Sequence, residues 1–472
     1  MSALAFASAA ELADRIRTRD LSPVTVVDDV LARIERSGVL NAFITVTADA
    51  ARAQAAEAER EIAAGRYRGP LHGIPVSLKD LVDTQGIRTT CGSRILADHV
   101  PSGDATVAAR LRGAGAVLLG KAALHEFAFG VTTNNPHYGP TRNPWRLDRI
   151  PGGSSGGSGA AVAAGLGPVS IGTDTGGSIR IPAALCGVVG LKPTYGRVSR
   201  HGVFPLSWSL DHVGPLTRTV LDAALVLQAI AGPDPYDPST LGQTVPDFST
   251  GLGKPLTGVR VGILADEYHG EMADDVRVQF HAAVDVLARL GLVLEDVEFP
   301  RAGEARTAAT TILYAEAASV HERWLTDRAG EYGADTLALL RQGQFLTATQ
   351  YLRAQRVRTL IVNEMAQLMR RYTALVSPTI PTVAPAIGQP TVTLGVRPTD
   401  ARGAMTRFVR LINFVGLPAI TVPCGVGADG LPVGLQIVGR SMDEPTMLAI
   451  AHAYEQATAW HTRRPPEPPQ RI

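Results

Sequence analysis

The chain has 472 residues, of which 45% are apolar and 19% are charged, and its formal net charge is +1. This balance predicts a soluble globular protein with a sizeable core and one to three domains. It excludes the basic surface on which nucleic-acid-binding proteins and membrane-bound helices depend, so we expect a small-molecule substrate and neither a nucleic-acid nor a membrane partner. The oligomeric state is left open between monomer and homodimer.

The first 65 residues are predicted to form a helical cap without catalytic residues. Ser8 and Glu11 have the spacing of a capping box, and a proline at the start of the next helix is typical of the first helical turn. The elements expected in this part are helices over 8–17, 23–37 and 49–64 and a strand over 41–46.

Residues 70–220 are predicted to form the core of the protein. Ile74, Val76 and Leu78 alternate with other residues as in a half-buried strand, and Lys79 follows at its end. The further elements expected here are strands over 116–119 and 169–172, a helix over 104–112 capped by Asp104, a helix or turn over 121–129, and helices over 158–166 and 179–186.

A second alternating section is expected over 259–465, after a surface connection at 232–258 that is rich in Pro, Asp, Gly and Ser. The elements expected after residue 216 are helices over 217–231, 273–290, 303–342, 347–372 and 445–456 and strands over 259–264, 293–299, 374–376, 419–422 and 433–438. Strands separated by helices predict an α/β fold with a mostly parallel sheet. Residues 466–472 are predicted to be a frayed tail.

Cysteine and histidine spacings indicate no metal and no cofactor. The three cysteines, Cys91, Cys186 and Cys424, are far apart, which predicts buried thiols in a reducing compartment and hence a cytoplasmic protein. His125 and Glu126 are not followed by the second histidine of a zinc-protease motif. Residues 1–10 lack the basic region of a signal peptide.

Lysine is rare in this chain. Only positions 79, 121, 192 and 254 carry it among 45 basic residues, so a lysine inside an apolar segment suggests a need that arginine cannot meet. One such need is a neutral amine, because a desolvated lysine loses its proton whereas arginine does not. Chance or steric fit explains any single lysine equally well.

Two clusters of glycine and hydroxyl residues, at 151–158 and 172–178, stand out from the rest of the sequence. Glycines that bring several N–H groups close to an exposed Ser178 hydroxyl would provide a nucleophile and its oxyanion donors. A flexible linker is the simpler interpretation, but apolar segments flank both clusters. Neither cluster has a phosphate-binding motif, and the G-x-S-x-G at 152–156 does not follow the buried strand that a nucleophile elbow needs.

These clusters and the segment Leu71–Asp80 closely resemble the motifs of the amidase signature family. The resemblance is dense over 70–220 and returns near Pro378 and over 413–425. It implies a single α/β domain over 1–465, with a large mixed sheet surrounded by helices. It also implies a triad in which Ser178 is the nucleophile, Ser154 follows a cis peptide bond, and Lys79 is the base.

The resemblance assigns further residues by position. The backbone N–H groups expected to form the oxyanion hole belong to Thr175, Gly176, Gly177 and Ser178. Ser155, Asp174 and Arg180 are expected to support the loop, with a purely structural ion pair between the last two as the simpler interpretation. Ala128, Phe129 and Trp208 are expected to line the substrate pocket, although core packing would explain them equally well.

Two functions within this family fit the motifs. Arg358 resembles the substrate-carboxylate arginine of the glutaminase A subunit of a tRNA-dependent amidotransferase, which would imply a protein complex with tRNA. Thr406, however, stands where that subunit has an aspartate for the glutamine amino group, and the characteristic segment Ser-Asn-Leu-x-Arg-Tyr-Asp-Gly is absent. We therefore expect a stand-alone hydrolase of alkyl or aryl amides, carbamates (urethanes included) or esters, with the glutaminase as the alternative. A silent binding subunit is disfavoured because the triad is complete.

Overall fold

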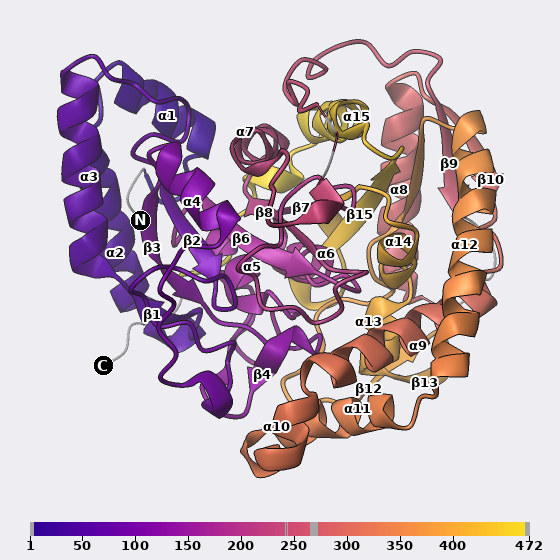
Figure 1. Ribbon diagram of the computed structural model, residues 1–472. Helices are drawn as coiled ribbons and strands as arrows, with labels where there is room; N and C mark the ends of the chain where they lie inside the picture. The colour runs from indigo at the N-terminus through magenta and orange to yellow at the C-terminus, as the bar shows by residue number, and fades with distance from the viewer. Residues whose placement is uncertain (1–3, 241, 243, 265–271, 468–472) are drawn as a thin grey trace.

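The computed structural model describes residues 4–240, 242, 244–264 and 272–467. Within these residues one 11-stranded sheet runs through the molecule and helices surround it, which confirms the α/β fold with a large mixed sheet (Figure 1). In sheet order the strands are β1 (Phe43–Val46), β3 (Val117–Ala122), β2 (Pro75–Lys79), β6 (Val169–Asp174), β8 (His212–Thr217), β7 (Val189–Lys192), β14 (Ala419–Val426), β15 (Pro432–Gly439), β11 (Ala374–Pro378), β9 (Arg260–Leu264) and β10 (Val293–Val297).

Parallel pairing occurs in two blocks of this sheet. β2 lies between β3 and β6 and is parallel to both, and β9 lies between β10 and β11 and is parallel to both. Antiparallel pairs join the strands between these blocks and attach β1 at one edge. Every residue of β2, β3 and β6 is buried, as expected for parallel strands that are covered on both faces.

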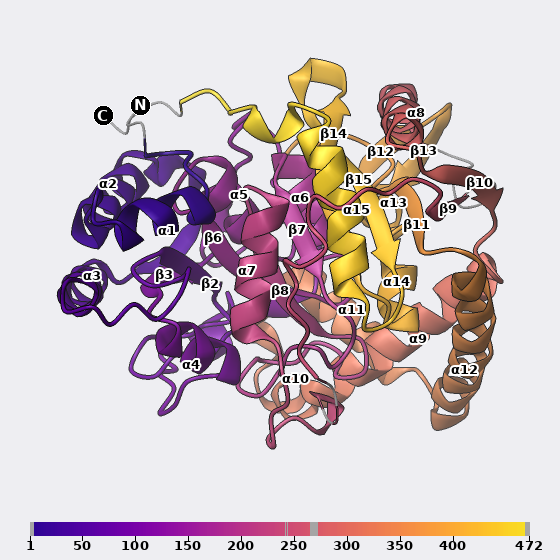
Figure 2. The same cartoon turned by 90° about the horizontal axis from the view of Figure 1, so that it is seen from above.

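The helices divide into groups along the chain. The longer ones are α1 (Ala9–Arg17), α2 (Pro23–Arg36), α3 (Ala48–Ala63), α4 (Thr106–Gly113), α5 (Gly156–Ala163), α7 (Val220–Ile230), α8 (Asp274–Arg289), α9 (Ala302–Val320), α11 (Ala334–Gln344), α12 (Ala348–Arg371) and α15 (Glu444–Gln456). The short ones are α6 (Arg180–Cys186), α10 (Glu322–Asp327), α13 (Ala401–Thr406) and α14 (Arg410–Val415). α7 and α15 lie side by side over the central strands, and α9 and α12 pack together at the far end from α1–α3 (Figure 2). No helix among the described residues is long and apolar enough to cross a membrane.

Local sequence patterns predict the N-terminal part well. Ser8 caps α1 and forms the predicted capping box with Glu11, and Ser22 caps α2. Asp104, in contrast, does not cap α4: its carboxylate accepts a hydrogen bond from the Gln85 N–H (2.7 Å) and pairs with Arg112 (2.8 Å), and Ala105 is the first flanking residue. The capping prediction is wrong because the Asp104 carboxylate binds the backbone of the loop at Gln85 instead of the first turn of α4.

Several elements are absent from the sequence prediction. β3 extends through Lys121 and Ala122, where a helix or turn was expected, because pairing with β2 and β1 continues that far. β7, β8, α13 and α14 were not predicted, because β8 contains Gly and Pro and the other three are only four to six residues long. Two hairpins, β4 (Asn134–Asn135) with β5 (Gly139–Pro140) and β12 (Thr391–Leu394) with β13 (Arg397–Asp400), were also missed. The predicted tail lies largely outside the described residues, as do positions 241 and 243 of the connection.

Candidate active site

The sheet brings Lys79 and the second glycine cluster to one place. β2 and β6 are parallel neighbours, so their carboxyl ends meet at the same edge of the sheet. Lys79 is the last residue of β2, and Thr173 and Asp174 end β6. The predicted base therefore faces the loop that carries Ser178.

The Lys79 amine is fully buried, and its hydrogen-bond partners within the described residues are hydroxyl groups. Its Nζ donates to Ser154 Oγ (2.7 Å) and to Thr173 Oγ1 (2.8 Å). Desolvation by burial lowers the pKa of Lys79 to about 7, against the opposing effect of the Asp174 and Asp211 carboxylates. A hydroxyl can also donate to an uncharged amine, so this environment accommodates Lys79 in its neutral form.

The other two buried lysines have different partners. Lys121 lies 3.6 Å from the Asp80 carboxylate and donates to the Val82 carbonyl (2.7 Å) and to the Thr89 hydroxyl, and Lys192 donates to the Leu417 carbonyl. A carbonyl oxygen only accepts, so it has no proton to give to an amine. Lys79 differs from both because no carbonyl or carboxylate among the described residues accepts from its amine.

Ser154 lies in a tight segment immediately before α5. The Gly153–Ser154 peptide bond is cis, as the resemblance implies. A Cβ at Gly153 would stand 2.8 Å from the backbone of Val131 and Thr132, so only glycine fits there. Thr133, which was not predicted, braces this segment: its hydroxyl donates to the Gly152 carbonyl (2.8 Å) and accepts from the Gly156 N–H (3.1 Å).

Ser178 lies in the loop between β6 and α6 and keeps 6% of its surface exposed. Within the described residues its hydroxyl has no hydrogen-bond partner, and the N–H groups of Thr175, Gly176 and Ser178 have no acceptor. The Gly177 N–H instead donates to Asp174 Oδ1 (2.8 Å). The loop thus presents three of the four predicted N–H groups unoccupied.

Asp174 and Arg180 form a fully buried ion pair (2.9 Å) that supports this loop. Although burial alone would raise the pKa of Asp174, the Arg180 guanidinium holds it well below its usual range. Arg180 also donates to Asn413 Oδ1 (2.6 Å) in α14 and to Gln436 Oε1 (2.6 Å) in β15, which ties the loop to the C-terminal half. Gln436 was missed, although a polar residue inside the apolar run 433–438 is a detectable sign.

Ser155, also predicted as support, connects the two glycine clusters. Its hydroxyl donates to the Thr173 carbonyl (3.1 Å) and accepts from the Thr173 N–H (3.3 Å), and its own N–H donates to the Ser178 carbonyl (3.2 Å). The serine loop and the nucleophile loop are therefore held together by the residue next to Ser154.

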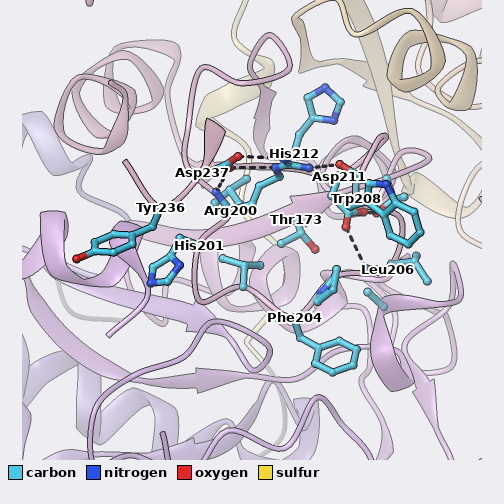
Figure 3. Close-up of a pocket in the computed structure, with 15 residues that line it drawn as sticks. Thr173, Arg200, His201, Phe204, Leu206, Trp208, Asp211, His212, Tyr236 and Asp237 are labelled. Atoms are coloured by element: carbon cyan, nitrogen blue, oxygen red, sulfur yellow. Dashed lines mark hydrogen bonds and ion pairs between the residues drawn. The ribbon is translucent and has the colours of Figure 1, made fainter. Parts of the chain in front are cut away.

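A pocket of about 230 Å³ is lined by Thr173, whose hydroxyl accepts from Lys79, and by Thr175 of the oxyanion loop (Figure 3). Ala128 and Trp208 also line this pocket, and Trp208 is 44% exposed; that it holds the substrate stays a prediction. Phe129 does not line this pocket; it packs edge-on against Tyr314 (5.4 Å between ring centroids).

Asp211 was not predicted and lies between this pocket and the oxyanion loop. Its carboxylate accepts from the Thr175 hydroxyl (2.6 Å) and from the N–H groups of Leu206 and Ser207. Burial raises the pKa of Asp211 to about 6.

We expect kcat/KM for amide hydrolysis to rise with pH through about 7 and then level off. Only the neutral Lys79 amine accepts a proton, so activity falls about tenfold per pH unit below that pKa. Asp211→Asn removes a carboxylate that raises the pKa of Lys79, so the rise in kcat/KM should occur at lower pH in this variant. A profile from pH 5.5 to 9 on both proteins tests this, and activity that is constant across the range would contradict it.

The comparisons with known proteins identify the family. A family model described as Amidase matches residues 25–448. The chain belongs to the amidase family. As an amidase it is a hydrolase acting on carbon–nitrogen bonds.

Solved structures extend the amidase assignment. One similar structure is described as an unexpected vestigial protein complex that reveals the evolutionary origins of an s-triazine catabolic enzyme. Its TM-score is 0.92 and its sequence identity is 37%, and the match covers 95% of this chain and 98% of that chain. A bacterial aryl acylamidase of the amidase signature family has a TM-score of 0.90 and 29% identity, covering 98% of each chain.

The curated relatives correct the predicted function of this amidase. The A subunit of glutamyl-tRNA(Gln) amidotransferase from Roseiflexus sp. (strain RS-1) is 41% identical over 95% of this chain and 96% of that protein. Seven further relatives, 40–42% identical, carry the same name. The preference for a stand-alone hydrolase is therefore wrong, and the alternative is favoured. The expectation of a small-molecule substrate without a nucleic-acid partner is contradicted by the same name.

Proposed function

We propose that this chain is the amide-hydrolysing component of a glutamyl-tRNA(Gln) amidotransferase and that it releases ammonia from the side-chain amide of glutamine. The observation that carries the chemistry is the buried Lys79 amine bonded to Ser154 beside the Ser178 loop. The similarity to the amidotransferase A subunits over nearly the whole of both proteins supports the biological role.

The proposed reaction begins with a proton relay. Neutral Lys79 takes the proton of the Ser154 hydroxyl, and Ser154 takes that of Ser178, so that Ser178 Oγ attacks the amide carbon. The proposal requires the Ser178 hydroxyl, which has no hydrogen-bond partner among the described residues, to turn to Ser154 Oγ when the substrate binds. Ser154 then gives a proton to the departing ammonia. Water attacks the resulting acyl-enzyme and releases glutamate, and the protons return along the same path.

The proposed oxyanion hole consists of the unoccupied N–H groups of Thr175, Gly176 and Ser178. Each well-placed donor of this kind lowers the barrier by about 3 kcal/mol. The Asp174 carboxylate holds the backbone of this loop in place, because it accepts hydrogen bonds from the Gly177, Ile179 and Arg180 N–H groups. The donors are therefore fixed before the substrate arrives.

The proposal implies a complex with further amidotransferase subunits and glutamyl-tRNA(Gln), and a cytoplasmic location. The three buried free cysteines support a reducing compartment. The near-zero net charge is compatible with this role, since partner proteins can supply the surface that binds tRNA.

Glutamine hydrolysis by the isolated chain and by the complex reconstituted with the other subunits tests the proposal. We expect glutamine-dependent ammonia release and conversion of glutamyl-tRNA(Gln) in the complex, and neither with Ser178→Ala. A complex that forms but leaves glutamine intact, while Ser178 still reacts with an active-site probe, would overturn the assignment.

A further inference from the structure

Two arginines lie close to the oxyanion loop. Arg402 is in α13 and Arg410 begins α14; together they are called the arginine pair. A Cβ built on Gly176 would stand 3.4 Å from Arg410 Nε, and one on Gly177 would stand 2.3 Å from the neighbouring Val409. Arg410 is thus packed against the loop that carries the nucleophile, and Arg402 lies near enough for its charge to act on Arg410.

Neither member of the arginine pair forms an ion pair with a carboxylate among the described residues. The charges of Asp400 and Asp335 act on Arg402, but Asp335 is paired with His125 (3.0 Å). Arg410 Nη1 donates to Thr310 Oγ1 (3.0 Å), whereas its buried Nε has no acceptor there. The Arg402 guanidinium lies over the rings of Phe129 (5.0 Å) and Tyr314 (5.7 Å). Two desolvated positive charges without an anion are costly, and a bound carboxylate would remove that cost.

Burial acts on both guanidinium groups in the same direction. It lowers the pKa of Arg410 to about 10, and the nearby Arg402 charge acts in the same direction. Burial also lowers the pKa of Arg402. The acidic residue in the preceding segment, Asp400, is occupied as the cap of α13, where it accepts from the Gly403 N–H (2.6 Å).

Arg358, which the sequence suggested as a carboxylate-binding arginine, is hydrogen-bonded to backbone carbonyls. Its Nε donates to the Phe414 carbonyl (2.7 Å) and its Nη2 to the Ser209 carbonyl (2.9 Å). Thr406 carries no charge to pair with a substrate ammonium, and its hydroxyl proton is donated to the Arg402 carbonyl (3.0 Å). These two positions therefore brace the backbone rather than face a ligand.

We propose that Arg410, with Arg402 beside it, binds the carboxylate of the amide substrate, and that no acidic group there selects for an α-amino group. The inference rests on the proposed amide hydrolysis at Ser178 and specifies its substrate class: the ω-amides of dicarboxylic acids, with or without an α-amino group. Phe129 and Tyr314 then hold Arg402 in place and cover the methylene groups of the ligand.

Three amides test this specificity: glutamine, 4-carbamoylbutanoate, which lacks the amino group, and pentanediamide, which lacks the carboxylate. We expect the first two to differ by less than about fivefold in kcat/KM, and pentanediamide to be about 30- to 100-fold poorer, as for loss of a charge-assisted pair. Arg410→Met should remove that preference mainly through KM, and Arg410→Lys should restore part of it. Arg341→Met, an exposed arginine of α11, is the control for net charge.

Binding is also measured without turnover, by the protection that glutarate gives Ser178 against a fluorophosphonate. The carboxylate site is supported if glutarate protects the wild type and Arg341→Met but does not protect Arg410→Met. If that result is obtained while glutamine is not hydrolysed, only the proposed function fails. Glutamine hydrolysis with unchanged discrimination and protection in a folded Arg410→Met protein would overturn the carboxylate site and leave the proposed function standing.

Discussion

Lys79→Arg is expected to lower kcat for amide hydrolysis by about 10³-fold or more, although it keeps the positive charge. Arginine stays protonated at any pH the protein tolerates, so it cannot accept the proton of Ser154. Lysine at this position has a pKa lowered to about 7 by burial, so a substantial fraction is neutral at physiological pH. The measurement is kcat with a saturating amide at pH 8.

A buried, larger and permanently charged side chain could also unfold the protein, so two further variants are needed. Lys79→Met removes the base without burying a charge and should be folded and equally inactive. Lys121→Arg makes the same exchange at another fully buried lysine, whose partner Asp80 needs only the charge, and should retain activity. Thermal unfolding midpoints establish that all three are folded. A folded Lys79→Arg protein with near-normal kcat would refute the role of Lys79 as base.

A fluorophosphonate is expected to form one covalent adduct, on Ser178, and Ser178→Ala is expected to lower kcat by roughly 10⁴-fold or more. Among the residues that the structure describes, neither the partly exposed Ser178 hydroxyl nor the N–H groups of Thr175, Gly176 and Ser178 have a partner, whereas Ser154 is fully buried and already bonded to Lys79. Intact-protein mass spectrometry gives the stoichiometry and peptide mapping gives the position.

Two serine variants serve as controls for the labelling. Ser154→Ala should slow the reaction of Ser178 with the probe strongly, because the relay to Lys79 is cut. Ser158→Ala removes another fully buried hydroxyl, whose hydrogen bond to the Ile171 carbonyl is long at 3.4 Å, and should leave labelling and turnover within a few-fold of the wild type. An adduct that maps to Ser154 would exchange the roles of the two serines.

The incorrect choice of function has a physical explanation. It depended on Thr406, which stands where the amidotransferase subunit has an aspartate, and on the absence of the segment Ser-Asn-Leu-x-Arg-Tyr-Asp-Gly, whereas Arg358 favoured the alternative. The Thr406 hydroxyl donates to the Arg402 carbonyl, so this position is no evidence against a glutamine substrate. Net charge, likewise, is a property of the whole chain and does not describe which surfaces an assembly uses.

The sequence by itself determined the α/β class, most of the helices and strands, and the identity of Lys79, Ser154 and Ser178 as candidates, because periodicity, caps and glycine-rich motifs are local features of the chain. It could not determine the long-range hydrogen-bond partners of the charged side chains. Gln436 meets Arg180, and the Gln85 N–H meets Asp104, only when distant segments pack. Tertiary structure alone decided that Lys79 faces hydroxyls and that Arg410 lacks an anion among the described residues, since desolvation and partner choice depend on the complete fold.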